Sequence, residues 1–313
     1  MWEVENTAVF IYRISIMGKP GYKFPVVLIL VLILLAGFVH SRSRRLVAPP
    51  RTLTHQTPDD FGIANWRDVT FTTADGLQLS GWYVPPQAEE GTALIFVHGL
   101  GSNRGALLDQ AAVLAKEGYG ALLFDLRAHG RSQGKQSSWG LAEVADVRAA
   151  LHFLQAQPEI DPARIGIVGH SMGGAIAIRA AAQMPEIRLV VAESVYTNFA
   201  GNEERLIISF ARLPAWTAPL IMDWAEWIAG VDSNQLAPLR EVASLAPRPI
   251  LFIQGGRDKT VHVSNGSTLY DTAVPPKERL LIPCAGHNNL FETDPELMTQ
   301  RLLQFLEQNL KSS

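Results

Sequence analysis

The feature that most constrains the fold of this chain is the alternation of short apolar runs with longer helix-like segments. The runs are four or five residues long and are bounded by turn-forming residues. Runs of this length and composition are typical of strands buried on both faces of a sheet. Because strands and helices alternate, the sequence predicts an α/β fold with a mostly parallel sheet flanked by helices. The runs are 93–97, 121–124, 165–168, 189–192, 250–253 and 279–282, and the helix-like segments include 107–117, 141–155, 175–182 and 295–310.

Two segments depart from this alternation. At its start, residues 68–73 and 78–84 flank Asp75 and Gly76, a pair that favours the positive φ angles of a type I′ hairpin turn. Later in the chain, the stretch of about 197–245 contains no strand-like run, but it carries apolar helix-like pieces separated by prolines. We interpret this stretch as a helical cap inserted into the domain.

The N-terminal region contains sixteen consecutive residues without a charge, 24–39, with lysines before them and arginines after them. As a helix this segment rises about 24 Å at roughly 1.5 Å per residue, a little less than a hydrocarbon core of about 30 Å. We expect a single-pass membrane anchor over 24–41, because the segment is apolar on every side and does not suit a buried core helix. The alternative is a cleaved signal peptide that starts at Met17, although no clean small-residue cleavage site precedes Arg42. Basic residues on both sides leave the orientation in the membrane open.

The remaining boundaries follow from composition. Residues 1–23 form an N-terminal segment, and 42–66, which is rich in proline and threonine, is expected to be a linker. The rest of the chain, 67–313, is predicted to form one α/β domain, because 47% hydrophobic residues supply enough apolar material for one sizeable core.

Charge and cysteine content exclude several classes of protein. The formal net charge of the 313 residues is −3, and basic residues are in excess only at the N-terminal end. The folded part is therefore acidic, whereas a nucleic-acid-binding domain is expected to be basic. The single cysteine, Cys284, excludes an internal disulfide framework and a cysteine-cluster metal site.

A candidate nucleophile follows the run at 165–168, where the chain reads Gly-His-Ser-Met-Gly (169–173) before a helix-like segment. The pattern Gly-x-Ser-x-Gly between a strand and a helix describes a sharp turn that lifts the serine above the sheet edge. Glycines are needed where crossing backbones leave no room for a Cβ atom, and a helix N-terminus favours a developing negative charge. Ser171 is therefore the candidate nucleophile; the alternative is a serine that only caps the helix.

A serine hydroxyl needs a base, and the base needs an acid that orients it. Asp258 follows the run at 250–253, and His287 follows the run at 279–282. The carboxyl ends of parallel strands meet at one edge of a sheet, which is where such folds bind ligands. The order serine, acid, histidine predicts a Ser171–His287–Asp258 triad, against the alternatives of a surface turn aspartate and a solvated histidine.

The third requirement is a pair of backbone N–H groups that stabilise the oxyanion of a tetrahedral intermediate. One is expected from Met172, directly after the nucleophile. The other is expected from the glycine-rich loop at 98–103, in which Leu100 is our candidate.

From about residue 70 to residue 310 the chain resembles the α/β-hydrolase superfamily. It is most similar to serine hydrolases that carry an N-terminal membrane anchor, and these border on the prolyl-oligopeptidase-like and dienelactone-hydrolase-like groups. The motifs that carry the resemblance are specific for the fold and the triad but say little about the substrate. They are His-Gly-Leu-Gly (98–101), Asp-Leu-Arg-Ala-His-Gly-Arg-Ser (125–132), Gly-His-Ser-Met-Gly-Gly (169–174), Ala-Pro-Arg-Pro-Ile (246–250), Gly-Gly-Arg-Asp (255–258) and Gly-His (286–287).

The resemblance implies an α/β-hydrolase fold with the nucleophile at Ser171, the acid at Asp258 and the base at His287. It also implies that Leu100 and Met172 form the oxyanion hole. The serine at position 171 excludes the cysteine nucleophile of dienelactone hydrolases and the aspartate nucleophile of haloalkane dehalogenases.

Other polar and aromatic residues have simpler interpretations. Asp125 and His129 are expected to be structural, because buried polar groups need partners, and Glu193, at a strand end, is the second candidate for the triad acid. The aromatic residues of the cap pack in a core or line an acyl pocket above the carboxyl ends of the strands. As candidate substrate-binding residues we name Phe210, Trp216, Trp224 and Trp227.

The sequence as a whole predicts a membrane-anchored serine hydrolase that cleaves carboxylic esters or thioesters through an acyl-enzyme on Ser171. The expected substrate is a small-molecule or lipid-derived ester with an apolar acyl group. No metal or organic cofactor and no nucleic-acid partner is implied. The alternatives are a serine peptidase or amidase with the same triad, and a non-catalytic membrane-tethered binding module. The sequence leaves open the acyl-chain length, the leaving group, the oligomeric state and protein partners.

Overall fold

The strands form one mixed sheet whose order confirms the α/β class. The computed structural model describes residues 20–89, 91–208 and 212–311, and within them an eight-stranded sheet has the order β1-β2-β4-β3-β5-β6-β7-β8. The pairings among β3 to β8 are parallel, whereas β1 pairs with β2 and β2 with β4 in antiparallel fashion. The strands are β1 (Arg67–Thr72), β2 (Gln78–Val84), β3 (Ala93–Val97), β4 (Gly120–Phe124), β5 (Ile165–His170), β6 (Ile187–Glu193), β7 (Ile250–Gly255) and β8 (Lys277–Ile282).

The β1–β2 hairpin forms at the predicted place, but its turn differs from the predicted type. Gly76 has φ +84°, while Asp75 does not adopt a positive φ. A type I′ turn needs positive φ at both central residues. The loop is instead longer than two residues and is closed by the N–H of Thr73, which donates to the carbonyl of Leu77 at 2.9 Å.

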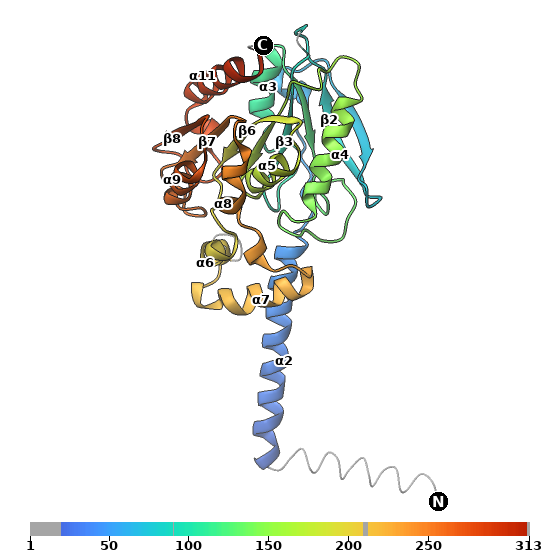
Figure 1. Cartoon of the computed structure of the whole chain (residues 1–313). Helices are drawn as coiled ribbons and strands as arrows, with labels where there is room; N and C mark the ends of the chain where they lie inside the picture. The colour runs from blue at the N-terminus through green and yellow to red at the C-terminus, as the bar shows by residue number, and fades with distance from the viewer. Residues whose placement is uncertain (1–19, 90, 209–211, 312–313) are drawn as a thin grey trace, which may run out of the picture.

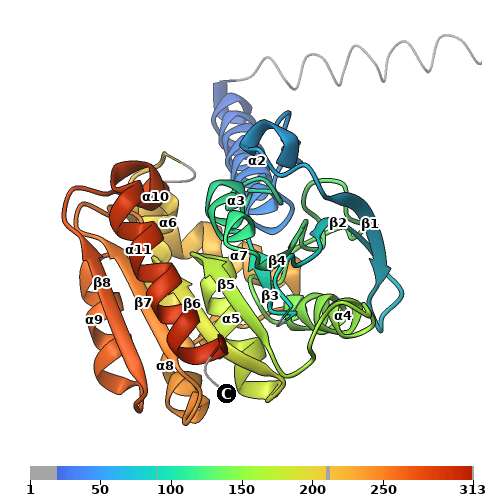
Figure 2. The same cartoon turned by 90° about the horizontal axis from the view of Figure 1, so that it is seen from above.

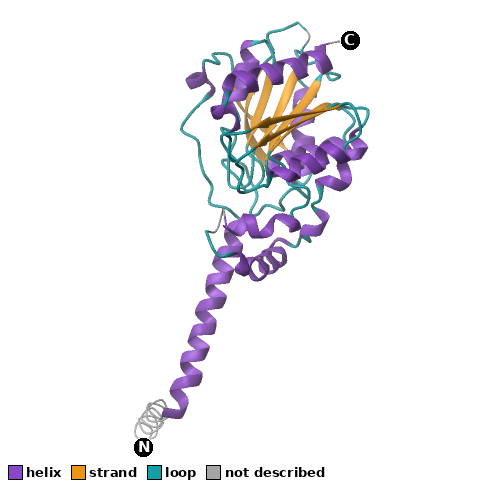
Figure 3. Ribbon diagram, turned by 90° about the vertical axis from the view of Figure 1, so that its left-hand side faces the viewer, coloured by secondary structure: helices purple, strands orange, loops and turns teal. Residues whose placement is uncertain are grey.

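Helices cover both faces of the sheet, as the views in Figure 2 and Figure 3 show. Alternate residues of a strand point to opposite faces. Leu94 and Phe96 of β3 therefore pack with α3 and α11, and Ile95 and Val97 pack on the other face with α4 and α5. The α-helices of the domain are α3 (Leu108–Lys116), α4 (Glu143–Gln155), α5 (Met172–Gln183), α6 (Glu203–Leu206), α7 (Ala218–Ala229), α8 (Pro238–Glu241), α9 (Val263–Thr272), α10 (Leu290–Thr293) and α11 (Pro295–Leu306).

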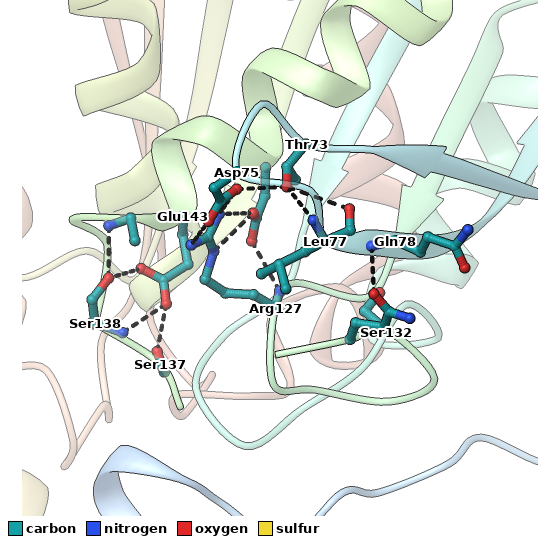
Figure 4. A network of polar contacts seen from close by, with 12 residues as sticks. Thr73, Asp75, Leu77, Gln78, Arg127, Ser132, Ser137, Ser138 and Glu143 are labelled. Carbon is teal, nitrogen blue, oxygen red and sulfur yellow. Dashed lines mark hydrogen bonds and ion pairs between the residues drawn. The ribbon is translucent and has the colours of Figure 1, made fainter. Parts of the chain in front are cut away.

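A polar network fixes the loop that follows β4 (Figure 4). The Arg127 guanidinium donates to Asp146 of α4 at 2.7 Å and to Asp75 of the hairpin at 2.9 Å. Beside it, Glu143 accepts hydrogen bonds from the hydroxyl of Ser137 and from nearby loop groups. Asp146 and Glu143 are fully buried, and buried polar groups need hydrogen-bond partners, which both carboxyl groups have here. The network therefore holds this loop in one conformation beside the carboxyl ends of the strands.

The N-terminal apolar segment lies in a long helix, α2 (Pro20–Val47), which projects from the domain (Figure 1). Among the described residues, it holds the segment that is long and apolar enough to cross a membrane, Phe24–Val47, within which an 18-residue window has a mean hydropathy of 2.6. Residues 24–38 are exposed, whereas Leu46 and Val47 are buried in the domain core. The chain can therefore hold its most apolar helix away from its folded core.

The segment expected to be a linker, 42–66, is fixed on the domain instead of running free. Its first six residues continue α2 because the apolar Leu46 and Val47 enter the core. Further on, the Arg51 guanidinium donates to the backbone carbonyls of His129, Gly130, Ser132 and Gly134. A charged side chain with four carbonyl acceptors ties this segment to the loop after β4.

The inserted stretch at about 197–245 is helical, as predicted, but it packs against α2. Helix α7 lies across α2 where α2 joins the domain (Figure 1). The Ser43 hydroxyl of α2 donates to the carbonyl of Ile221 in α7 at 2.7 Å. The packing of the insertion on α2 sets where its aromatic side chains lie.

Candidate active site

The turn between β5 and α5 places Ser171 in a strained conformation. Its φ and ψ are +56° and −119°, a region that non-glycine residues rarely adopt. The N–H of Ser171 donates to the carbonyl of Glu193 at 2.8 Å, which links the turn to the end of β6. A Cβ at Gly169 would lie 2.3 Å from the carbonyl oxygen of Gly173, and a Cβ at Gly173 would lie 2.1 Å from that of Val97. The tight turn that exposes the serine is therefore possible only with glycines at these two positions.

The three residues predicted as a triad form one hydrogen-bonded chain. His287 Nε2 lies 3.0 Å from Ser171 Oγ, and His287 Nδ1 lies 2.7 Å from Asp258 Oδ2. The three side chains come from the loops after β5, β7 and β8, which are parallel strands with a common carboxyl edge. The side chain of Asp258 is fully buried and that of His287 is 9% exposed. The arrangement can move a proton from a serine hydroxyl to an imidazole whose other nitrogen faces a carboxylate.

The Asp258 carboxylate is held by four donors. Oδ1 accepts from the N–H groups of Thr260 and Val261, each at 2.8 Å, and Oδ2 accepts from Gln254 Nε2 at 3.1 Å as well as from His287. Burial acts to raise the pKa of Asp258, but the hydrogen bond and charge of His287 and the two backbone donors outweigh it, so the pKa lies below its ordinary value. Asp258 is therefore ionised at neutral pH and fixed in orientation.

His287 is set up to act as a base at neutral pH. Burial lowers its pKa, the hydrogen bond to Asp258 raises it, and the nearby His170 lowers it again, with a net pKa below the ordinary value of 6.5. The imidazole is therefore neutral at neutral pH. With Nδ1–H donating to Asp258, Nε2 is free to accept the proton of Ser171.

This pKa predicts how activity depends on pH. As the predicted base, His287 could accept the Ser171 proton only when it is neutral, so hydrolytic kcat/KM is expected to be full above its pKa and to fall as pH drops through it. The acid limb should lie below pH 6.5. In a His170→Gln variant the limb should move to higher pH, because a neighbour that lowers the pKa of His287 is removed. A pH profile with p-nitrophenyl acetate checks both; a limb above pH 6.5 in the unaltered protein would contradict the assignment.

The loop after β3 is fixed on both sides of Leu100, the candidate oxyanion donor. His98 Nδ1 lies 2.8 Å from the carbonyl of Gly99, and its Nε2 accepts from the N–H of Leu126 at 3.1 Å. His129 Nε2 accepts from the N–H of Gly101 at 3.0 Å. Burial and the neighbouring His129 lower the pKa of His98 to about 3, so His98 is neutral and acts as a hydrogen-bonding partner.

Hydrogen bonds to Asp125 also fix the same loop, in agreement with the structural role predicted for this residue. Its carboxylate accepts from the N–H groups of Arg104 and Arg131 at 2.8 and 2.9 Å.

Met172, the other candidate oxyanion donor, is the first residue of α5. The N–H groups of a first helical turn have no acceptor within their own helix and point toward the N-terminal end.

A cavity of about 420 Å³ opens on the triad and is lined by Ser171 and His287. Apolar side chains on its wall include Leu100, Leu107 and Phe291. Acidic side chains include Asp109, whose pKa is raised to about 6 chiefly by burial and also by the charges of Glu193 and Glu292.

Several residues around the cavity are not among those that the sequence predicts. Thr52 comes from the predicted linker, and no local pattern marked it. Asn288 and Phe291 come one and four residues after the base, and this proximity was the signal that could have indicated them. Asn288 Oδ1 lies 3.3 Å from His170 Nε2 beside the site.

Two other groups of candidate side chains do not take part in the hydrogen-bonded chain of the triad. Glu193, the second candidate acid, faces His170 Nδ1 at 3.8 Å and accepts from Gln110 at 3.2 Å, whereas Asp258 holds His287. The predicted substrate-binding tryptophans Trp216, Trp224 and Trp227 do not line the cavity. They are exposed on α7 and on the turn before it, and Trp224 contacts His40 of α2. Phe210 lies outside the described residues.

Comparisons with known proteins agree with the fold. A model described as the alpha/beta hydrolase family matches residues 94–301. The chain is 33% identical over 282 residues to the protein Rv2307c of Mycobacterium tuberculosis, covering 89% of this chain and 91% of that protein. It is 38% identical over 195 residues to the thiohydrolase aneE of Aspergillus aculeatus, covering 61% and 60% of the two chains.

Among solved structures, the esterase Pf2001 of Pyrococcus furiosus matches with a TM-score of 0.73 and 31% sequence identity. The match covers 85% of this chain and 98% of the esterase. The family match, the strand order and the serine at the β5–α5 turn lead to one conclusion: this chain belongs to the alpha/beta hydrolase family.

Proposed function

We propose that the protein is a membrane-anchored serine hydrolase that cleaves carboxylic esters or thioesters with an apolar acyl group. The observation that carries this proposal is the hydrogen-bonded chain from Ser171 through His287 to Asp258, at the wall of a cavity large enough for a small substrate.

The steps follow from the positions of the atoms. Ser171 Oγ attacks the acyl carbonyl carbon while His287 Nε2 takes the hydroxyl proton. His287 then donates this proton to the leaving oxygen or sulfur as its bond to the acyl carbon breaks, leaving an acyl-enzyme on Ser171. A water molecule attacks the acyl-enzyme by the same steps in reverse, which releases the acid and restores the serine. Asp258 keeps His287 in the tautomer with the proton on Nδ1 and stabilises its imidazolium form.

Transition-state stabilisation comes from backbone donors in this proposal. The N–H groups of Leu100 and Met172 face the oxyanion that forms when Ser171 attacks. One donor of this kind typically contributes about 2.7–4 kcal/mol to transition-state stabilisation. The hydrogen bonds that His98 and His129 make to the residues on either side of Leu100 support this assignment, because they hold the loop in place before substrate binds.

Two observations support an apolar acyl group on an ester or thioester. The cavity wall includes Leu107, Leu290 and Phe291 near the base. In addition, the similar proteins include one named as an esterase and one named as a thiohydrolase. Membrane anchoring rests on α2, whose residues 24–38 are exposed and form an apolar stretch of the length and composition that suit a membrane-spanning helix.

A substrate comparison tests the proposal. The purified full-length protein in detergent is expected to hydrolyse p-nitrophenyl esters and an acyl thioester with higher kcat/KM than the p-nitroanilide with the same acyl group. Within the esters, kcat/KM should rise from acetyl to longer acyl chains, because longer chains reach the apolar wall. A fluorophosphonate probe should label Ser171.

The other outcomes identify the alternatives. Faster cleavage of the anilide than of the ester would make the protein an amidase or peptidase. Absence of both turnover and fluorophosphonate labelling in folded protein would indicate a non-catalytic binding module.

A further inference from the structure

Helix α7 exposes an apolar surface that the hydrolase chemistry does not use. Trp227 is 72% exposed and Trp216, just before the helix, is 80% exposed. Leu220, Trp224 and Trp227 are spaced four and three residues apart, so they form one stripe on the helix. The opposite stripe is buried in the domain and consists of Ala218, Ile221, Met222 and Ala225. We call Trp216, Leu220, Trp224 and Trp227 the α7 surface.

A helix that is apolar on two opposite sides is unusual on a water-exposed surface. A surface helix of a soluble domain normally has one apolar stripe, which faces the core, and a polar face toward water. Contiguous exposed apolar side chains mark sites that contact a protein partner or a membrane. The α7 surface is therefore expected to contact either a protein partner or a membrane.

The α7 surface is continuous with the candidate membrane helix. The indole N–H of Trp224 donates to His40 Nδ1 of α2 at 3.1 Å, and the two rings meet edge to face. Ser43 of α2 donates to the carbonyl of Ile221. Helix α7 therefore contacts α2 at His40–Ser43, immediately after the exposed residues 24–38.

The length of α2 places α7 at the boundary of a bilayer. From Phe24 to His40 the helix rises about 24 Å, and from Phe24 to Ser43 about 28 Å, at roughly 1.5 Å per residue. The hydrocarbon core of a bilayer is about 30 Å thick. If Phe24 lies at one boundary of this core, α7 lies at the other boundary. The exposed Arg44 and Arg45 follow at the level of the headgroups.

The chemistry of the α7 surface fits that position. Tryptophan is enriched at membrane–water interfaces, because its ring is apolar and its N–H needs a polar partner. Helix α7 contains Asp223 and Glu226 but no lysine or arginine. Attraction to anionic lipids therefore does not explain the surface, and burial of apolar side chains among zwitterionic lipids does.

We propose that the α7 surface docks onto the lipid bilayer at the boundary between headgroups and acyl chains, on the side of the membrane that holds the hydrolase domain. The proposal rests on the membrane anchoring stated above and adds a second contact. Helix α2 alone leaves the domain free to rotate about the helix axis, whereas α7 lying across α2 (Figure 1) holds one face of the domain against the lipid.

Quenching by brominated lipid tests this contact in the full chain. The protein is reconstituted into phosphatidylcholine vesicles whose acyl chains carry bromine near the carbonyl end or carry none. A Trp2→Phe background removes the tryptophan of the N-terminal segment. Bromine should then quench a substantial part of the emission, because three of the six remaining tryptophans belong to the α7 surface.

The matched variant carries Trp216→Phe, Trp224→Phe and Trp227→Phe in the same background. It should lose most of the bromine-dependent quenching, because Trp82 and Trp139 are buried in the hydrolase domain and Trp66 packs against Trp82. Phenylalanine keeps the apolar bulk, and unchanged ester hydrolysis in detergent shows that the variant is folded. The single variant Trp227→Phe, at the more exposed of the two tryptophans in α7, should lose part of the quenching and serves if the triple variant does not fold.

Each other outcome overturns the proposal. A protein that floats with the vesicles but shows no bromine-dependent quenching is anchored by α2 without docking α7. Quenching that is equal in parent and triple variant comes from tryptophans elsewhere. Self-association that requires the three tryptophans, without quenching, makes a second copy the occupant. If the protein does not float with the vesicles, both the membrane anchoring and the docking of the α7 surface are wrong. Ester hydrolysis in detergent then still tests the catalytic part of the proposed function.

Discussion

Ser171→Ala is expected to lower kcat for ester hydrolysis by on the order of 10^6, because the acyl-enzyme can form only on this hydroxyl. His287 and Asp258 remain in place but have no nucleophile to activate. The fluorophosphonate probe should no longer label the protein. Turnover of p-nitrophenyl esters by the purified variant, followed under substrate saturation, measures the loss. Activity within tenfold of the parent would remove Ser171 as the nucleophile.

A second substitution at the same position separates lost chemistry from lost structure. Ser171→Gly also lacks the hydroxyl, but glycine adopts φ +56° without strain. Relief of the strain is worth about 1–3 kcal/mol, and the chain entropy of unfolded glycine offsets about 0.5–1 kcal/mol. The glycine variant should therefore be inactive yet more stable than the alanine variant by about 1 kcal/mol in urea unfolding. Equal stability of the two would show that the turn is not strained at Ser171.

The parts of the molecule that the sequence predicts depend on local patterns. The strands appear as short apolar runs, and each triad residue directly follows one of them. Since parallel strands end at one edge of the sheet, the placement of Ser171, Asp258 and His287 along the chain is enough to predict that they meet. The motif Gly-x-Ser-x-Gly adds a steric reason, because the fold leaves no room for a Cβ at Gly169 or Gly173.

The parts that could not be predicted depend on contacts between distant segments. Nothing local in residues 197–245 says that α7 packs against α2 and not over the carboxyl ends of the strands. The hydrogen bond that fixes this packing joins Ser43 to Ile221, 178 positions apart. The pattern therefore indicates that the insertion is aromatic and helical, but it cannot say that Trp216, Trp224 and Trp227 lie beside α2 and away from the cavity.

The predicted linker shows the same difference between composition and contact. Prolines and threonines in 42–66 favour an extended chain, and composition does not reveal where such a chain attaches. Arg51 attaches it to the loop after β4 through backbone carbonyls, which any sequence could offer. This attachment brings Thr52 to the rim of the cavity.

Asp258→Asn is expected to lower kcat about 10^4-fold, because the substitution reverses the tautomer of His287. In the native site, Oδ1 of Asp258 accepts from the backbone N–H groups of Thr260 and Val261. A backbone N–H can only donate, so the single oxygen of an asparagine must face these two groups and its NH2 group must face His287. The Gln254 amide, which donates to Oδ2 in the native site, would then reverse so that its Oε1 accepts. Nδ1 of His287 then becomes the acceptor and Nε2 carries the proton. A protonated Nε2 cannot take the proton of Ser171.

The matched control is Glu193→Gln, at the second candidate for the triad acid. Glu193 faces His170 and Gln110, so its charge does not fix the tautomer of His287, and kcat should fall by far less than in Asp258→Asn. The 15N chemical shifts of His287 supply a readout that mere loosening of the site would not move. They should report a proton on Nδ1 in the parent and in Glu193→Gln, and a proton on Nε2 in Asp258→Asn. If Glu193→Gln reversed the tautomer while Asp258→Asn left it unchanged, the orienting acid would be Glu193, and the triad would have to be redrawn at the end of β6.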